Sequence, residues 1–343
     1  MIKELLQEGF ILKSKGKYKH AIEFFYKALE IDDTSSELML EIAECYYFMG
    51  DIERALNYIE QSLQKNPAHI GSLKLLKQIF MGNKAWKDAE QTAKNIYYVS
   101  GNPNDLAEIF SLLNKQGKFQ ELFEYQISEN NAAILYELAY AKFLLNDFEA
   151  AEKYINRSLD AEYSKKSILL KGKILFKMNR LDECIELLKT VKIDEEDAEM
   201  LNFAGLVEQY KCNYSESINY LLKAVRLQPQ NDLYNYDCAS TYFKMGNIQQ
   251  AKKYYNLAIT INPENKNYHF ALANLYYSEK YYKRAMEELN YDFFEANLLK
   301  AIILYDSGYI ALAKKEFKKL SAEQPENELI KTYQLKIEEN LKI

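Results

Sequence analysis

A small side chain recurs along this chain at a nearly constant interval, usually after a glycine or asparagine turn followed by an aromatic or aliphatic residue. Nine such residues, with a leucine in the fourth place, form the series Ala21, Ala55, Ala89, Leu122, Ala151, Cys184, Ser217, Ala251, Ala285 and Ala313. The successive intervals are 34, 34, 33, 29, 33, 33, 34, 34 and 28 residues. Ten positions at almost one period are hard to obtain by chance, so the 343-residue chain is built from internal repeats.

Proline and glycine divide each repeat into two parts. Four of the five prolines, Pro67, Pro229, Pro263 and Pro325, follow an amphipathic helical stretch that proline cannot continue. Within each repeat, apolar residues follow i, i+3, i+4, i+7 spacing in two runs, which predicts two helices. The break between the runs has Gly16, Gly50, Gly117, Gly246 or Gly308, with Asn146, Asn179 or Cys212 elsewhere. Glycine and asparagine tolerate positive φ, so each break is predicted to be a helix cap inside a helix-turn-helix hairpin.

The phased set of residues resembles the tetratricopeptide repeat family. The first unit has Gly9, Gly16, Tyr18, Ala21, Phe25 and Ala28, and the eighth has Ala239, Tyr242, Gly246, Ala251, Tyr255, Ala258 and Pro263. The resemblance spans roughly residues 2 to 325 and implies an all-α fold, in which about ten antiparallel helix pairs stack into a right-handed superhelical solenoid.

The repeat predicts one solenoid over residues 1–325. Its units are expected at 2–33, 36–67, 70–102, 103–130, 132–164, 165–197, 198–229, 232–263, 266–292 and 294–325. Residues 326–343 have apolar side chains at helical spacing and are predicted to form a C-terminal capping helix. The short intervals of 29 and 28 predict a shortened second helix in the fourth and ninth units, around 126–131 and 291–294. Either neighbouring residues repack there, or the chain has a hinge or a partner platform.

Charge and hydropathy argue against several classes of function. The formal charge is −6 and the pI is near 5.5, so no basic surface for nucleic acid or anionic membrane is expected. No stretch approaches eighteen uncharged apolar residues, and Lys3, Glu4 and Glu8 interrupt the start where a signal peptide needs an apolar core. We therefore expect a cytoplasmic protein without a membrane span.

The residues needed for catalysis or metal binding are scarce. The chain has three histidines, and its cysteines, Cys45, Cys184, Cys212 and Cys238, form no C-x-x-C pair. No phosphate loop, nucleophile elbow or zinc motif is present in the sequence. The acidic run 194–197 could attract a cation or a basic peptide, but a solvated helix start explains it as well. We expect no enzyme activity, no cofactor and no metal.

The resemblance also implies that the first helix of each hairpin lines the concave groove. The residues three before, one after and four after its small residue then form a stripe rich in aromatic side chains: Tyr136, Tyr140, Phe143, Phe176, Tyr236, Phe243, Phe270 and Tyr277. These rings either anchor a partner in the groove or reach into neighbouring hairpins. Family members that bind a terminal carboxylate use a lysine and an asparagine on one helix; here Lys74 is followed by Gln78, and the next first helix offers Glu108, so that clamp is not expected.

The sequence therefore predicts a non-enzymatic scaffold or adaptor that binds a protein or peptide, contacting apolar or aromatic groups, in its concave groove. Two alternatives stay open. One is a regulatory or substrate-holding subunit of a multiprotein enzyme or secretion system. The other, which the acidic charge opposes, is an RNA-binding helical repeat.

Overall fold

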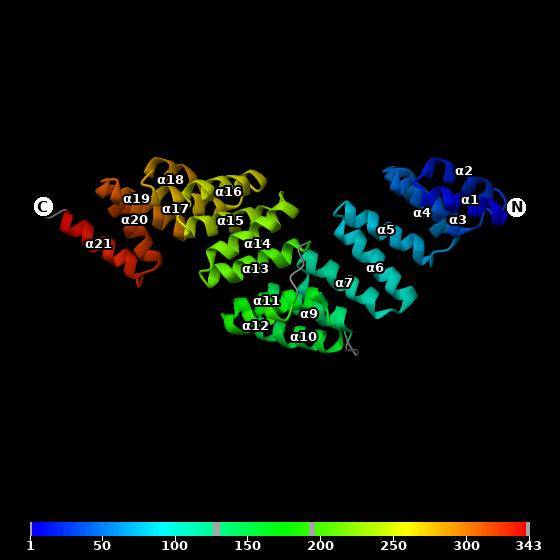
Figure 1. The fold of residues 1–343 in the computed structure, drawn as a ribbon, viewed down its shortest axis with the longest axis horizontal. Coiled ribbons are helices and arrows are strands. Elements are labelled where there is room, and N and C mark those ends of the chain that lie inside the picture. Colours follow the sequence, from blue (N-terminus) through cyan, green and yellow to red (C-terminus); the bar gives the residue numbers. More distant parts are fainter. Residues whose placement is uncertain (1, 126–130, 192–195, 341–343) are drawn as a thin grey trace. The chain divides into compact units, whose positions relative to one another are not determined.

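The computed structural model describes residues 2–125, 131–191 and 196–340, and Figure 1 shows that these form helices joined by short turns. No β-strand occurs within those three ranges. The predicted all-α class is confirmed, and the helices form helix-turn-helix pairs that stack as in a solenoid.

First and second helices alternate along the chain. The first helices are α1 Ile2–Ser14, α3 Ser36–Phe48, α5 Ile70–Gly82, α7 Pro103–Gln116, α9 Ala132–Leu144, α11 Lys165–Lys177, α13 Ala198–Tyr210, α15 Asp232–Lys244, α17 Lys266–Ser278 and α19 Phe294–Asp306. The second helices are α2 Tyr18–Leu29, α4 Ile52–Lys65, α6 Trp86–Ser100, α8 Phe119–Glu124, α10 Phe148–Ala161, α12 Leu181–Lys189, α14 Tyr214–Leu227, α16 Ile248–Ile261, α18 Tyr282–Glu288 and α20 Ile310–Glu323. The last helix is α21 Glu328–Asn340.

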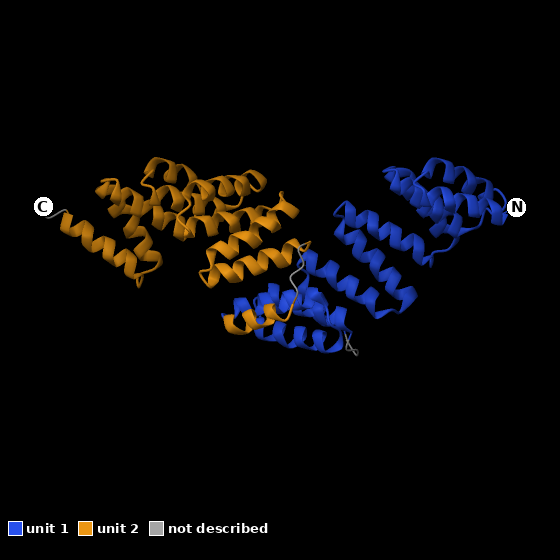
Figure 2. Ribbon diagram, viewed as in Figure 1, with its two compact units in different colours: residues 1–180 blue, residues 181–343 orange. Residues whose placement is uncertain are grey.

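The helices belong to two compact units, residues 1–180 and 181–343 (Figure 2). Within each unit, a helix packs on its hairpin partner and on the helices of the next hairpin. Examples are α3 with α4 and α5 in the first unit, and α15 with α16 and α17 in the second. The predicted domains, a ten-repeat solenoid over 1–325 and a cap over 326–343, stay a prediction. The compact units of the structure meet at a different point, after residue 180.

The recurring small residue is buried in every hairpin. It is the fourth residue of each second helix, and all ten of the residues that define the period are 0% exposed. Leu122 is as fully buried in the fourth place as the alanines are elsewhere. A small side chain at this point lets two helix backbones approach closely, which explains why the period is so regular.

A residue with positive φ ends each first helix, two positions before the second helix begins. Besides the glycines, asparagines and cysteine that the sequence predicts there, Lys84 and Lys280 adopt φ of 56° and 62°. The turns share one hydrogen-bond pattern: Gly246 N–H donates to the Phe243 carbonyl at 2.9 Å, and Asn247 N–H donates to the Tyr242 carbonyl at 2.9 Å. This Schellman arrangement satisfies carbonyls at the helix end, so even a lysine is kept in the left-handed region.

Replacing Lys280 with glycine should raise the free energy of unfolding by about 1 kcal/mol, because glycine adopts positive φ without steric cost. Replacing Gly246 with alanine should lower it by a similar amount, since φ is +75° there and an added Cβ would meet no atom within 4 Å. Urea unfolding of the two variants beside the parent chain measures both changes. Shifts of the same sign in both would contradict the explanation.

A second small position lies in the middle of the first helices. Their eighth residue is buried glycine or alanine in eight hairpins: Gly9, Ala43, Ala139, Gly172, Gly205, Ala239, Ala273 and Ala301. A Cβ added at Gly205 would come within 2.6 Å of Leu221 Cγ and 3.2 Å of the Ser217 carbonyl oxygen. The third and fourth hairpins break this rule with Lys77 and Phe110.

Two second helices are shortened where the sequence predicts it. Helices α8 and α18 have 6 and 7 residues, whereas α4, α10, α14, α16 and α20 have 14. Residues 126–130, where the first of these changes was expected, lie outside the described residues. Helix α12, with 9 residues, is also short, which the regular interval from Cys184 to Ser217 did not indicate.

Side-chain contacts hold the segment that follows the short helix α18 in place. His269 Nδ1 lies 2.7 Å from Glu288 Oε2, and its Nε2 lies 3.0 Å from the Pro263 carbonyl oxygen. The Tyr291 hydroxyl donates to the same carbonyl at 3.0 Å. Leu289 is 1% exposed, so the residues after α18 are packed rather than loose.

The last helix, α21, covers α20. Ile330 and Ile337 are each 1% exposed, and the Tyr333 ring stacks on Phe317 with centroids 5.1 Å apart. Apolar side chains of α21 thus pack on α20 in one hydrophobic cluster.

Candidate partner-binding surface

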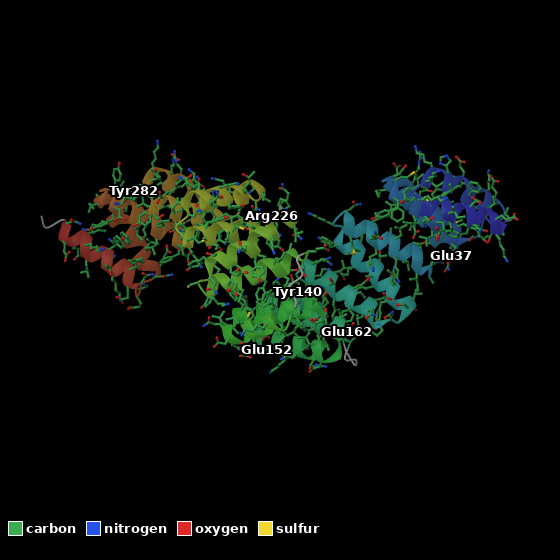
Figure 3. The ribbon with its side chains drawn as sticks, in the orientation of Figure 1. Glu37, Tyr140, Glu152, Glu162, Arg226 and Tyr282 are labelled. Atoms are coloured by element: carbon green, nitrogen blue, oxygen red, sulfur yellow. The ribbon has the colours of Figure 1, made fainter. Side chains whose placement is uncertain are left out.

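In the first unit, three of the predicted aromatic residues lie along α9. Tyr136, Tyr140 and Phe143 are half-buried and pack against Ala139 and Ile155. The Tyr136 and Tyr140 rings are nearly parallel, 7° apart, with centroids separated by 6.3 Å. Tyr140 is labelled in Figure 3. Each ring therefore has a packed part and an exposed part.

Two further contacts fix the orientation of this group. The Lys166 ammonium lies 4.0 Å from the centroid of the Tyr136 ring, close enough for a cation–π interaction. Phe143 packs on Phe148 of α10 with centroids 5.8 Å apart. Phe176, on α11 of the same unit, is also half-buried.

In the second unit, the four remaining predicted residues lie on α15 and α17, and all four are half-buried. Tyr236 stacks on Tyr268 with centroids 5.0 Å apart. Phe270 meets Phe293 edge to face at 5.5 Å. The Tyr277 hydroxyl donates to Asp306 Oδ2 at 2.6 Å.

These contacts agree with both interpretations of the aromatic residues, as anchors for a partner and as packing between hairpins. All eight rings are half-buried, and at least seven of them pack on neighbouring side chains, so their rotamers are restricted. None of the eight is fully buried, so part of each ring is accessible. A ring that is fixed on one side and open on the other loses little conformational entropy on binding.

A buried polar pair lies beside the aromatic group of the second unit and was not predicted from the sequence. Asn202 Nδ2 donates to Asp237 Oδ2 at 2.7 Å, and the two residues are 4% and 6% exposed. Burial raises the pKa of the Asp237 carboxyl to about 7, although the Asn202 hydrogen bond acts in the opposite direction. Asn202 Oδ1 is buried and has no hydrogen-bond partner in the structure.

A chain of polar contacts continues along α13 and α15. Gln209 Nε2 donates to Thr241 Oγ1 at 2.6 Å, and Lys244 Nζ donates to Gln209 Oε1 at 2.9 Å. The Thr241 hydroxyl in turn donates to the Asp237 carbonyl at 3.0 Å. These bonds join two neighbouring first helices and so limit their relative movement.

Lys74 and Gln78 lie on α5 and Glu108 lies on α7, at the positions where a carboxylate clamp was not expected. Gln78 Nε2 donates to the Tyr47 hydroxyl at 3.0 Å, and Glu108 pairs with Lys77. Lys74, Gln78 and Glu108 line one pocket together with Lys77. Sequence reasoning missed Lys77 here, although its place in a series of glycines and alanines could have drawn attention to it.

The described residues provide little of the chemistry an active site needs. No group of three or more His, Cys, Asp or Glu residues in this part of the chain could hold a metal ion. Burial raises the pKa of the Cys45 and Cys184 thiols to about 11, which disfavours the reactive thiolate. Among the helices that the structure describes, none has the length and apolar character needed to cross a bilayer.

Two family profiles match parts of the chain. The tetratricopeptide repeat profile matches residues 132–164 and 234–265, and a profile described as anaphase-promoting complex, cyclosome, subunit 3 matches residues 14–96. The first matched segment coincides with the fifth predicted unit, and its helices α9 and α10 pack as an antiparallel hairpin. These two segments of the chain are tetratricopeptide repeats.

Two relatives resemble the chain over longer segments. A TPR repeat-containing protein of Methanocaldococcus jannaschii is 23% identical over 309 residues, which cover 75% of this chain and 51% of the relative. A photosystem I assembly protein, Ycf3, of Prochlorococcus marinus is 27% identical over 110 residues, covering 31% of this chain and 61% of that protein. The chain thus spans only part of the length of these curated relatives.

Two solved structures share the solenoid fold. The crystal structure of the APC/C hetero-tetramer Cut9–Hcn1 has a TM-score of 0.64 at 12% identity, covering 98% of this chain and 76% of that chain. The structure of pilF from Pseudomonas aeruginosa has a TM-score of 0.51 at 17% identity, covering 60% and 97%. At these identities the similarity concerns the fold.

Proposed function

We propose that this tetratricopeptide repeat protein is a non-enzymatic scaffold that binds a protein or peptide through the aromatic side chains of its first helices. The observation that carries the proposal is the half-buried state of all eight predicted rings, from Tyr136 on α9 to Tyr277 on α17. Rigid aromatic rings with one open side are the side chains that most often dominate binding energy in protein interfaces.

The partner we propose has apolar or aromatic side chains that fit between these rings. The formal charge of −6 and the shortage of basic residues on the aromatic stripe favour a protein over a nucleic acid. The names of related proteins agree with a role in assemblies: one relative is an assembly protein, and one similar fold was solved in a hetero-tetramer. A cytoplasmic location is part of the proposal.

A triple variant tests this function. Replacing Tyr236, Phe243 and Phe270 with alanine should remove most of the partner binding, because hot-spot residues contribute about 2 kcal/mol or more each. Tagged parent chain and variant would be purified from the native host, and bound proteins identified by mass spectrometry. A partner that is recovered with the parent chain and lost with the variant is the expected result.

A matched control distinguishes an effect of the proposed surface from an effect of removing any three aromatic side chains. Tyr98, Tyr163 and Tyr309 are 91%, 66% and 60% exposed and lie outside the predicted stripe. Their triple alanine variant should retain the partner, and circular dichroism should show that both variants keep their helices. Equal recovery of the partner by the parent chain and the Tyr236, Phe243, Phe270 variant would reject the proposed surface.

A further inference from the structure

The third hairpin has a lysine at a position where eight of the other nine hairpins have glycine or alanine. Lys77 is the eighth residue of α5, the position occupied by glycine or alanine in eight of the ten hairpins. It is only 8% exposed, and burial lowers the pKa of its ammonium group. A charged residue at a position that the fold fills with alanine elsewhere adds a desolvation cost and no packing advantage, which is typical of a functional site.

Lys77 lines a pocket between three first helices of the first unit. The pocket has a volume of about 690 Å³ and lies against Tyr47 of α3, Lys74 and Lys77 of α5, and Glu108 and Lys115 of α7. Met81 and Leu112 provide apolar lining. On both α5 and α7 the lining residues span two helical turns, so the pocket is elongated by about 10 Å along the helices.

The charges of this pocket are unbalanced. Three lysines and one carboxylate, that of Glu108, line the pocket, and Glu108 pairs with Lys77. The charge of Asp105, also on α7, acts on Lys77 as well but does not line the pocket. Lys74 and Lys115 are exposed and form no ion pair with any residue the structure describes. Lys115 lies over the ring of Trp86, 5.3 Å from its centroid. A local excess of positive charge in a chain of net charge −6 attracts negatively charged groups selectively.

We propose that this pocket binds an acidic segment of a partner protein, with an Asp or Glu side-chain carboxylate placed between Lys74, Lys77 and Lys115. The carboxylate gives the ammonium group of Lys77 a further counter-ion, and Met81 and Leu112 contact the methylene groups of the bound segment. Side-chain carboxylates are assigned rather than a chain terminus, because the one amide on this face, Gln78, is already bonded to Tyr47.

This site is independent of the aromatic residues of the proposed function. None of the pocket residues belongs to that set, and the pocket lies on α3, α5 and α7 rather than on α9, α11, α15 or α17. The two surfaces can therefore be tested separately, and loss of one leaves the other open to measurement.

Three fluorescein-labelled peptides, the first two with blocked ends, test the assignment on the full chain. One has four Glu residues around a central Leu, the second has Gln in place of each Glu, and the third is the Gln peptide with a free terminal carboxylate. Anisotropy measures the affinity. Emission of Trp86, the only tryptophan in the sequence, reports whether binding occurs beside Lys115. The Glu peptide should bind at concentrations below about 1 mM, change the Trp86 emission, and weaken as salt is raised.

Four variants identify the groups responsible. Lys77→Ala and Lys74→Gln should each weaken binding of the Glu peptide by about three- to tenfold, and Glu108→Gln should strengthen it by about two- to fivefold, because it removes the competing carboxylate. Lys65→Gln, an exposed lysine on α4, makes the same charge change as Lys74→Gln and should leave the affinity unchanged. Lys77→Ala introduces the residue type found at this position in most other hairpins, so the melting temperature of the variant should not fall.

The contrary results are equally specific. Binding of the Glu peptide that Lys77→Ala and Lys74→Gln leave unchanged would overturn the site, and so would binding without a change in Trp86 emission. No binding of any of the three peptides up to about 1 mM would overturn it as well. Preference for the peptide with the free terminus would overturn the assignment to side-chain carboxylates.

Discussion

Replacing Asp237 with asparagine should raise the free energy of unfolding by up to about 4 kcal/mol at pH 8 and leave it almost unchanged near pH 4. Burial raises the pKa of this carboxyl from 3.8 to about 7 in the folded chain. Between these values the folded state binds a proton that the unfolded state releases. Stability from this group therefore falls as pH rises from about 4 to about 7, and then stays low.

Asparagine has almost the shape of the protonated acid and carries no charge at any pH, so the variant should not show that fall. Its carboxamide oxygen can still accept the hydrogen bond from Asn202 Nδ2. The measurement is urea unfolding of parent and variant from pH 4 to pH 8, taking the difference at each pH so that other titrating groups cancel. Glu264→Gln, at an exposed carboxylate of the same unit, is the control and should give a difference near zero throughout.

Parallel stability curves for the parent chain and the Asp237→Asn variant would show that the carboxylate is not desolvated in the folded chain. The tyrosines around Asp237 do not interfere with the experiment. The pKa values of the Tyr234, Tyr236, Tyr255 and Tyr268 hydroxyls are all raised, mainly by burial, so these groups stay neutral over the whole range.

The second large effect is expected at Phe110, where alanine should reduce stability by about 3–5 kcal/mol. Phe110 is 0% exposed and meets the Tyr125 ring edge to face at 5.2 Å. It stands at the position that is glycine or alanine in most hairpins, opposite a second helix of only 6 residues. Its ring fills space near this short helix, and truncation to alanine leaves a cavity there.

Amide hydrogen exchange over residues 103–125, together with thermal unfolding, would locate and measure the loss. Phe48→Ala, which removes a ring that is 55% exposed, should cost much less and is the control. Protection factors in α7 that stay at the parental level in Phe110→Ala would mean that the cavity collapses or that the ring carries little of the packing.

The sequence was sufficient to predict the alternation of helices, because the small residues and the turn residues are both local requirements. Ala21 and its nine equivalents are buried as the period predicts, and the glycine and asparagine turns have the positive φ that their chemistry allows. Lys84 and Lys280 were missed as turn residues because lysine has no intrinsic preference for that conformation. Their turns are fixed by the hydrogen bonds of the helix end, which composition does not reveal.

The candidate site was less predictable. The positions of the eight aromatic residues on first helices followed from the repeat, but their partial burial depends on neighbours such as Tyr268 and Phe293 that the period does not specify. The Asn202–Asp237 pair joins residues 35 positions apart in the sequence, and neither residue type is unusual on a helix. The shortening of α12 was hidden because the residues that follow it restore the ordinary interval.

Packing between near neighbours has a consequence for how such a chain changes over generations. In the part of the chain that the structure describes, helices pack substantially only on helices one or two places away along the sequence. A fold with so low a contact order can begin to form at any hairpin and grow outward. For the same reason, an in-frame duplication or loss of one 34-residue segment disturbs only the two junctions beside it. The number of hairpins, and with it the length of surface available to partners, is thus open to selection separately from the fold itself.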